Sequence, residues 1–263
     1  MNILERIVAH KKVEVAARKA HTPAGVLEQY SFFRRPVLSL QASLLDPART
    51  AIIAEFKRKS PSKGTINNQA TVEHVTRAYA RSASGISVLT DEDFFGGTLA
   101  DLHHARFNQV PILRKDFMID EYQLVEARAN GADVVLLIAA CLSPAAVKQM
   151  AGVARNLGLE VLLEIHDETE LEHICDAVNL VGVNNRNLKS FEVSIQTSLD
   201  LISQIPSSKP AIAESGISDV ETIVSLKQAG FRGFLIGEHF MREPDPAIAF
   251  AAFVQQLKAK NEN

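Results

Sequence analysis

Eight short runs of apolar residues constrain the fold more than any other feature of this sequence. They stand at 51–56, 85–89, 111–114, 133–138, 159–165, 178–183, 209–213 and 233–236, and each is followed by a helix-like stretch. Runs such as VVLLIAA and EVLLEI are continuously apolar, as in strands that are buried on both faces, whereas half-exposed antiparallel strands alternate. The pattern therefore predicts parallel strands joined by helices.

The segments between the runs carry helix start and stop signals. Ser143–Leu157 and Asp219–Ala229 open with capping residues, and Gly158 and Gly230 follow them. Eight βα units at this length fit a closed barrel better than an open doubly wound sheet, and no glycine-rich dinucleotide fingerprint follows the first run. The predicted fold class is α/β, a (β/α)8 TIM barrel.

The first 48 residues precede the first apolar run. They show helical periodicity with basic side chains and end in the stretch SLLDPART. This predicts an N-terminal helical extension and not a second domain. We expect a single TIM-barrel domain over residues 1–263, with the extension at 1–48 and the barrel at 49–263.

Composition and charge narrow the range of partners. Hydrophobic residues make up 46% and charged residues 22%, and the net charge of -3 provides no general attraction for nucleic acid or an anionic membrane. Cys141 and Cys175 stand alone, without the spacing of a disulfide framework or a zinc site. With no targeting segment or membrane-length run, we expect a cytoplasmic protein that binds a small phosphorylated molecule locally.

Charged residues end three of the predicted strands. Period-two alternation places Glu55 and Lys57 on the same side of the first strand, while Lys115 ends the third and Glu164 ends the fifth. In a (β/α)8 barrel, reactive groups lie at the carboxyl ends of strands. A single such residue is more often a salt-bridge partner or part of a solvated loop, but Lys, Lys and Glu on three strand ends favour a catalytic site.

The sixth and seventh strands add further polar candidates. Asn184, Arg186 and Glu214 share the inward parity expected of site residues. Asparagine also serves turns through bonds to its own backbone, so we favour a functional role for Asn184 and a turn role for Asn185.

The last two strands are followed by loops of small residues. Ser215 and Gly216 follow the seventh strand, and Gly237 and Glu238 follow the eighth. Free backbone N–H groups beside a helix start hold phosphate in many barrels. A single glycine at such a turn is weak support, whereas two adjacent loops predict a phosphate site.

The histidines are assigned no chemistry. His103, His104, His166, His173 and His239 lack metal-ligand spacing, and their predicted helix or loop settings favour packing or surface roles.

Several motifs together resemble one family. IIAEFKRKSPSKG, SVLTDEDFFGG, PILRKDF, ADVVLLI, LLEIHDE, GVNNRNL, AESGI and FLIGEHFM resemble, in order, the signatures of monofunctional indole-3-glycerol-phosphate synthases. They span residues 52 to 241, while the first 48 residues match only as a helical extension. Multiple ordered matches are far more specific than any one of them.

The resemblance implies an activity without cofactor or metal. The substrate would be 1-(2-carboxyphenylamino)-1-deoxyribulose 5-phosphate, which closes to an indole with loss of carbon dioxide and water. Lys115 would act as the general acid for ring closure, Glu164 as acid or base in the dehydration, and Lys57 would lie beside the substrate carboxylate. A positioned ammonium stabilises oxyanion charge, and we expect the two crowded lysines to lower each other's pKa.

The same resemblance implies roles for the remaining residues. Glu55, Asn184 and Glu214 would orient the reacting groups, Arg186, Ser215, Gly216, Gly237 and Glu238 (through its N–H) would lie on the phosphate side, Phe95, Phe117 and Leu136 would form an apolar wall, and Ser60 would also bind substrate. The sequence departs from the family pattern at Glu238, where many members have a small residue, and at Asn185, where Ser is common. Neither departure removes a catalytic group.

Three alternatives stay open at this stage. One is another phosphosugar barrel such as phosphoribosylanthranilate isomerase, which should not need two strand-end lysines with Glu164. The others are a Schiff-base aldolase and a non-catalytic phosphate-binding barrel. We expect a monomer, and we allow weak association with other enzymes of tryptophan biosynthesis.

Overall fold

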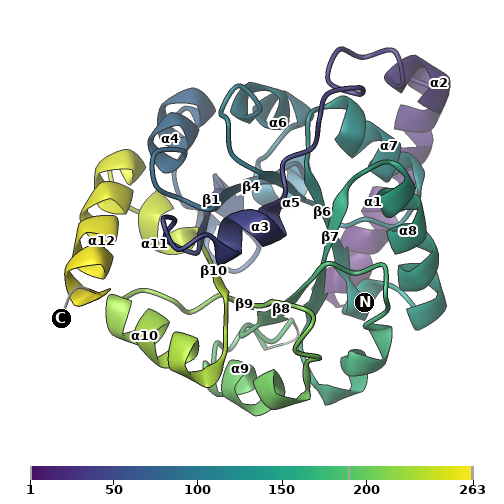
Figure 1. Ribbon diagram of the computed structural model, residues 1–263. Coiled ribbons are helices and arrows are strands. Elements are labelled where there is room, and N and C mark those ends of the chain that lie inside the picture. Colours follow the sequence, from purple (N-terminus) through teal and green to yellow (C-terminus); the bar gives the residue numbers. More distant parts are fainter. Residues whose placement is uncertain (1, 189, 262–263) are drawn as a thin grey trace.

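Eight parallel strands close into a barrel in the computed structural model of the chain, which describes residues 2–188 and 190–261 (Figure 1). Met1, Lys189 and residues 262–263 of the predicted domain span lie outside the described residues. The barrel strands are β1 (Ile52–Phe56), β4 (Gly85–Leu89), β5 (Ile112–Lys115), β6 (Val134–Ile138), β7 (Glu160–Ile165), β8 (Leu180–Asn184), β9 (Ala211–Glu214) and β10 (Gly233–Ile236). The predicted (β/α)8 fold is confirmed, and the predicted strand ends differ from the observed ones by at most two residues.

Helices surround the barrel and connect its strands. They are α4 (Val72–Tyr79), α5 (Glu92–Phe95), α6 (Leu99–Ala105), α7 (Tyr122–Ala129), α8 (Pro144–Asn156), α9 (Gln196–Leu201), α10 (Val220–Ala229), α11 (Glu238–Met241) and α12 (Pro246–Asn261), with the 3-10 turns η1 (Ala139–Cys141), η2 (Glu168–His173) and η3 (Ile202–Gln204). As predicted, Ser143 and Asp219 accept N-cap hydrogen bonds, and Gly230 follows α10 with a φ of 121°. A two-stranded hairpin, β2 (Lys59–Ser60) with β3 (Gly64–Thr65), follows β1.

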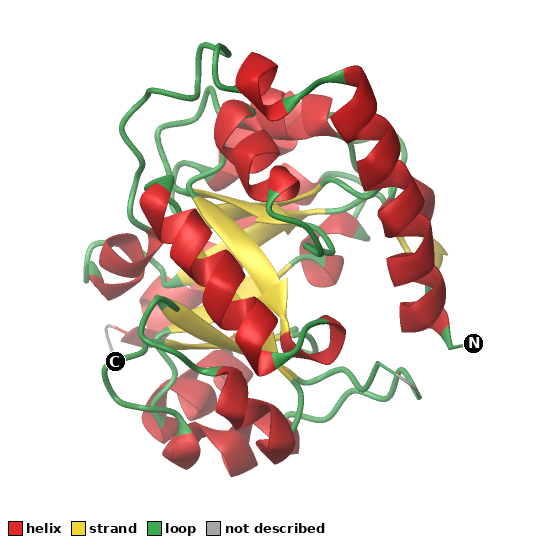
Figure 2. Cartoon of the chain, turned by 90° about the vertical axis from the view of Figure 1, so that its right-hand side faces the viewer, coloured by secondary structure: helices red, strands yellow, loops and turns green. Residues whose placement is uncertain are grey.

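Three helices precede the first strand: α1 (Ile3–His21), α2 (Ala24–Leu27) and α3 (Leu40–Leu45). The helical character predicted for this segment is confirmed, and Figure 2 shows α1 as a long helix at one edge of the barrel. The Tyr122 hydroxyl of α7 donates to the carbonyls of Arg18 and Thr22 at 3.2 and 2.9 Å, which fixes the end of α1 against the barrel wall.

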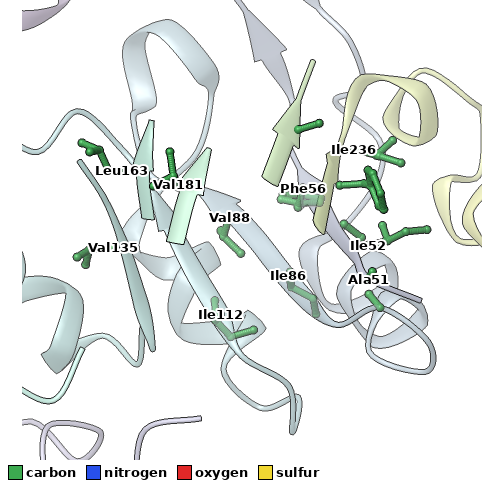
Figure 3. Close-up of a cluster of buried hydrophobic side chains, with 14 of the residues drawn as sticks. Ala51, Ile52, Phe56, Ile86, Val88, Ile112, Val135, Leu163, Val181 and Ile236 are labelled. Carbon is green, nitrogen blue, oxygen red and sulfur yellow. The ribbon is translucent and has the colours of Figure 1, made fainter. Parts of the chain in front are cut away.

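The strand side chains alternate between two apolar clusters. Ile52 and Phe56 face outward into the layer between strands and helices (Figure 3), while Ile53 faces the barrel interior. The interior cluster consists of Leu40, Leu44, Ile53, Leu113, Val134, Leu136, Ile138, Leu162, Leu180, Ile212 and Leu235. Because side chains alternate along a strand, Glu55 points to the barrel interior as Ile53 does, two positions nearer the carboxyl end of β1. The barrel interior is therefore apolar toward the amino ends of the strands and charged at their carboxyl ends.

Candidate active site

The carboxyl ends of the barrel strands surround one cavity, and most of the predicted site residues line it. Those that face the cavity are Glu55, Lys57, Ser60, Phe95, Lys115, Phe117, Leu136, Glu164, Asn184, Arg186, Glu214, Ser215 and Glu238. Gly216 and Gly237 lie in an adjoining pocket that shares Lys57, Arg186 and Glu238 with the first. The structure thus gathers every predicted site residue at one end of the barrel.

Lys115 ends β5 and pairs with two buried carboxylates. Its Nζ donates to Oε2 of Glu164 on β7 at 3.0 Å and makes a short hydrogen bond to Oε2 of Glu214 on β9. These are its two ion pairs within the described residues. Since an ammonium carries three N–H donors, one donor stays available for a ligand in the cavity.

The electrostatics of Lys115 contradict the expectation that crowded lysines would lower each other's pKa. Burial alone would lower the pKa of Lys115, but the carboxylates of Glu164, Glu214 and Glu55 outweigh burial and raise it. The sequence suggested the lysines as neighbours, whereas the fold surrounds Lys115 with carboxylates from three other strands. Lys115 is therefore protonated in the free protein.

The two carboxylates on Lys115 are not equivalent. Burial alone would raise the pKa of Glu164, but Lys115 and His166 lower it. Burial and the nearby carboxylates of Glu164 and Glu55 raise the pKa of Glu214 to about 7, although Lys115 opposes this change. Glu164 is thus held as a carboxylate, and Glu214 can exchange a proton near neutral pH.

Gly182 on β8 makes room for Glu214. A Cβ at Gly182 would lie 2.1 Å from Oε1 of Glu214, which is far inside contact distance. Within the described residues, this buried Oε1 accepts no hydrogen bond. Any side chain at Gly182 would therefore force the Glu214 carboxylate to move.

Lys57 and Glu55 form a further ion pair of the cavity. Nζ of Lys57 lies 2.7 Å from Oε1 of the buried Glu55, and the Ser87 hydroxyl donates to Oε2 of Glu55 at 3.4 Å. A Cβ at Gly237 would lie 2.6 Å from Oε1 of Glu55. Gly237, predicted only for phosphate binding, thus also leaves the space that Glu55 occupies.

Asn184 is held by two donors at the end of β8. Its Oδ1 accepts from the Ser215 hydroxyl at 2.8 Å and from the backbone N–H of Arg186 at 3.0 Å. The second bond is the local turn contact that we considered as an alternative, so Asn184 both shapes the turn and faces the cavity. With its oxygen fixed in this way, its amide nitrogen can serve a ligand.

The adjacent Asn185 has a different role from the one expected. Its buried side chain accepts from the Ser198 hydroxyl at 2.8 Å and from the Ser198 backbone N–H at 3.1 Å. It therefore ties the end of β8 to α9. The predicted turn role is wrong, because the acceptor is used by a residue of the following helix and not by the local backbone.

The phosphate side of the cavity combines backbone and charged side chains. Ser215 and Gly216 have consecutive positive φ values of 67° and 76°, which turn the chain sharply after β9. Nη2 of Arg186 lies 3.4 Å from Oε2 of Glu238, and Nζ of Lys63 lies 3.9 Å from Oε1. The sequence suggested that Glu238 binds phosphate only through its N–H group. In the structure its carboxylate also lies in this region, where it would compete with a phosphate for Arg186 and Lys63.

The apolar wall receives residues that sequence reasoning missed. The rings of Phe95 and Phe117 have centroids 6.0 Å apart, and Ile3, Leu4 and Ile7 of α1 line the same cavity. The only signal for these three was helical apolar spacing, and that spacing does not tell which surface a helix covers.

His166 was assigned no chemistry, yet it lies beside the central carboxylate. Its Nε2 is 3.2 Å from Oε1 of Glu164, and its Nδ1 is 3.1 Å from Oε2 of Glu170 in η2. The available signal was parity, because His166 stands two positions after Glu164 and leaves the strand on the same side.

The described residues offer neither a metal cluster nor a membrane-spanning helix. In residues 2–188 and 190–261, no three or more His, Cys, Asp or Glu side chains gather in an arrangement that could hold a metal ion. Over the same residues, no helix combines the length and apolar character needed to cross a bilayer.

The fold and the cavity define the class of the protein: a (β/α)8 barrel with a lysine–carboxylate site at the carboxyl ends of its strands. The model of the family described as "Indole-3-glycerol phosphate synthase" matches residues 4–253. The chain belongs to the indole-3-glycerol phosphate synthase family.

Individual relatives agree with the family match. The chain is 45% identical over 259 residues to an indole-3-glycerol phosphate synthase of Bacteroides thetaiotaomicron, with 98% of this chain and 99% of the relative covered. It is 42% identical over 261 residues to that of Variovorax paradoxus, with 95% and 98% covered. A mutant tryptophan synthase α-subunit of Pyrococcus furiosus superposes with a TM-score of 0.62 at 17% identity, over 81% of this chain and 99% of that one, and shares the fold.

Proposed function

We propose that this chain catalyses the indole-3-glycerol phosphate synthase reaction on 1-(2-carboxyphenylamino)-1-deoxyribulose 5-phosphate. The ring carbon that carries the carboxylate attacks the sugar carbonyl, carbon dioxide leaves, and water is lost to give indole-3-glycerol phosphate. The observation that carries the proposal is the Lys115–Glu164 pair at the cavity of a chain that belongs to this family.

Lys115 is the proposed general acid of ring closure. As the new carbon–carbon bond forms, the carbonyl oxygen gains negative charge and takes a proton to become a hydroxyl. The Lys115 ammonium has a donor left for this oxygen and neutralises the charge that develops on it. Loss of carbon dioxide then returns the bonding electron pair to the ring.

The dehydration needs both an acid and a base. The hydroxyl leaves as water after it gains a proton, and a ring C–H proton is then removed. We assign the proton transfers of this step to Glu164, with Glu214 able to hold a proton because its pKa is near 7. Lys57 would lie by the carboxylate that is lost and share acid work with Lys115.

Binding is assigned to the rim of the same cavity. Arg186, the N–H groups at Gly216 and Glu238, and the adjoining Ser215 and Gly237 form the proposed phosphate site. Ser60 on β2 completes this rim above the cavity. Glu55, Asn184 and Glu214 orient the sugar and the reacting groups, and Phe95, Phe117 and Leu136 contact the aromatic ring.

The working unit is proposed to be one chain. The helices of residues 1–48 belong to the same domain as the barrel over 49–263, because Ile3, Leu4 and Ile7 contribute to the cavity. We propose a monomer in the cytoplasm that can associate weakly with other enzymes of the pathway. The proposed steps move protons and carbon dioxide, so no cofactor is assigned.

The proposal is tested by incubating the purified chain with the carboxyphenylamino substrate. We expect a rise in indole fluorescence with equimolar release of carbon dioxide, unchanged by EDTA. Conversion to another product, or capture of the substrate on a lysine by borohydride, would replace the proposed reaction by isomerase or Schiff-base chemistry.

A further inference from the structure

The side chain of His166 lies between two carboxylates, one of which belongs to the site. Nε2 of His166 is 3.2 Å from Oε1 of Glu164, and Nδ1 is 3.1 Å from Oε2 of Glu170. The same Oε2 of Glu170 also accepts the backbone N–H of His166 at 2.6 Å. The imidazole is thus hydrogen-bonded to η2 through Nδ1, while Nε2 lies within ion-pair distance of the Glu164 carboxylate without forming a hydrogen bond to it.

The two oxygens of Glu164 have separate partners. Oε2 accepts from Lys115 at 3.0 Å, while Oε1 faces His166. The residue is 3% exposed, so the surrounding protein and not water fixes its orientation. Without the contact to His166, the carboxylate would be free to rotate both oxygens around Lys115.

We propose that His166 is a positioning residue: its imidazolium, held by Glu170, fixes Oε1 of Glu164 and leaves Oε2 for Lys115 and the substrate. This inference rests on the proposed function, since it concerns how Glu164 is kept in place while Lys115 donates a proton to the carbonyl oxygen. It assigns a role to a segment, η2, that lies outside the cavity of the reaction.

Charge around the imidazole supports the protonated form. Burial alone would lower the pKa of His166, but Glu164 and Glu170 outweigh burial and raise it to about 10. The titratable and charged groups near it are Glu164 with its partner Lys115, Cys141 of η1, and Asp167, Glu170, Arg186 and Glu192, which line the pocket on the far side. At neutral pH both ring nitrogens therefore carry protons and can face both carboxylates.

The contact between His166 and Glu164 matters most while Lys115 reacts with the substrate. When Lys115 gives its proton to the carbonyl oxygen, it becomes a neutral amine, and the buried charge of Glu164 would otherwise be poorly compensated. An imidazolium on the opposite oxygen keeps the carboxylate charged and in place. His166 thus acts on the reaction through Glu164 and touches no reacting atom.

Two substitutions of His166 distinguish the contact of Nε2 with Glu164 from that of Nδ1 with Glu170. In His166→Gln the amide nitrogen can reach the position of Nε2, so a neutral donor to Glu164 is kept. In His166→Asn it can reach only the position of Nδ1, so the contact with Glu170 is kept and that with Glu164 is lost. Both substitutions remove the positive charge.

We expect His166→Asn to lower kcat about tenfold to a hundredfold with KM changed less than about threefold, because positioning acts mainly in the transition state. The acidic limb of the kcat profile should move to higher pH by at least about one unit, since loss of a neighbouring cation raises the pKa of Glu164. His166→Gln should recover part of kcat but keep the shifted limb.

His173 provides a matched control in the same segment. Its ring nitrogens lie 3.0 Å from the carbonyl oxygen of Glu170 and 2.9 Å from that of Leu142, and it contacts no cavity residue through these bonds. His173→Asn should reduce thermal stability without moving the pH profile. If His166→Asn fails to fold, Glu170→Gln tests the same arrangement, because it weakens the contact that holds His166 in place. We then expect a smaller shift in the acidic limb of the kcat profile.

The outcomes distinguish this inference from the proposed function. If Glu164→Gln keeps wild-type turnover, the role of Glu164 in the proposed function fails. If Glu164→Gln is inactive while His166→Asn and Glu170→Gln keep wild-type kcat and an unmoved acidic limb, His166 has only a structural role and the inference is overturned. A matching limb shift in His173→Asn would also overturn it.

Discussion

Two lysines of this molecule, one fully buried and one at the edge of the cavity, are both surrounded by carboxylates but differ in what they can do. Lys11 of α1 is fully buried, and its Nζ lies 2.6, 2.8 and 3.0 Å from carboxylate oxygens of Glu14, Asp91 and Asp116. Lys115 pairs with two carboxylates, Glu164 and Glu214. Lys11 therefore has three carboxylates within ion-pair distance, whereas Lys115 donates hydrogen bonds to two and keeps one N–H donor for a ligand.

The network around Lys11 continues outside the barrel. Arg114 is fully buried between β5 and α7, where its guanidinium donates to Asp116 at 3.0 Å and to Glu126 at 2.8 Å, as well as to Thr90 and Gln123. Arg114 and Lys115 are neighbours in sequence, but alternation sends one outward into this network and the other inward to the cavity.

The comparison shows that burial and charge by themselves do not identify a site. Both lysines have a pKa that carboxylates raise against the effect of burial. What distinguishes Lys115 is an incomplete set of partners at a cavity that is lined by polar residues of five barrel strands, β1, β5, β7, β8 and β9. The network at Lys11 attaches α1, and thereby Ile3, Leu4 and Ile7, to the barrel.

The largest effect is expected at Lys115. Lys115→Ala should lower single-turnover ring closure about 10⁴-fold while substrate affinity, measured by fluorescence, changes little, because the ammonium acts on charge that develops in the transition state. Lys115→Arg should not restore the rate, since a guanidinium keeps the charge but is a poor proton donor. Turnover of Lys115→Arg within about tenfold of wild type would contradict a general-acid role.

Lys11→Met tests the other side of the comparison. Removing this cation leaves buried carboxylates without a partner, so the unfolding free energy in urea should fall by about 3–5 kcal/mol. KM should rise because α1 lines the cavity. The value of kcat should fall less than about tenfold, because Lys11 takes no part in proton transfer, whereas loss of a general acid or base costs about 10²-fold or more. A loss of kcat as large as that of Lys115→Ala would remove the distinction between the two lysines.

Glu164→Gln should keep the shape of the site and lose its base. We expect turnover to fall at least about 10²-fold with nearly unchanged substrate binding. The measurement is steady-state kcat alongside substrate affinity, and near-normal turnover would exclude Glu164 from proton transfer.

Arg186→Ala should mainly raise KM, by about tenfold, because a guanidinium on a phosphate contributes similarly to substrate and transition state. Its present partner is the carboxylate of Glu238, so Glu238→Gln serves as the comparison variant. If kcat alone changes in Arg186→Ala, Arg186 lies at the reacting centre instead.

The smallest expected effect concerns acid stability. Burial alone would raise the pKa of Asp116, but Arg114 and Lys11 lower it to about 2 from a usual value of 3.8. The stabilisation is therefore complete above pH 3.8 and is lost as pH falls through 2. Between pH 5 and pH 3 the unfolding free energy of wild type should fall by about 1 kcal/mol more than that of Asp116→Asn. Equal slopes for the two proteins would contradict this.

Much of the barrel and of its polar rim was predictable from the sequence. Continuous apolar runs predicted parallel strands, and period two predicted that Glu55 and Lys57 would face the same cavity. The pKa of Lys115 was predicted in the wrong direction, because the sequence order does not reveal that Glu164 and Glu214 approach it from β7 and β9. The residues of α1 were missed for the same reason, whereas His166 could have been found from its parity with Glu164 two positions earlier.

The sequence by itself determined the number and parity of the strands and the family to which the chain belongs, because periodicity and ordered motifs are local properties of the chain. Only the tertiary structure decided which charges meet. Lys11 and Asp116 are 105 positions apart, and Lys115 and Glu214 are 99 apart, yet each pair shares a contact. Barrel closure and the docking of α1 create those contacts, and the resulting electrostatics depend on distance in space and not along the chain.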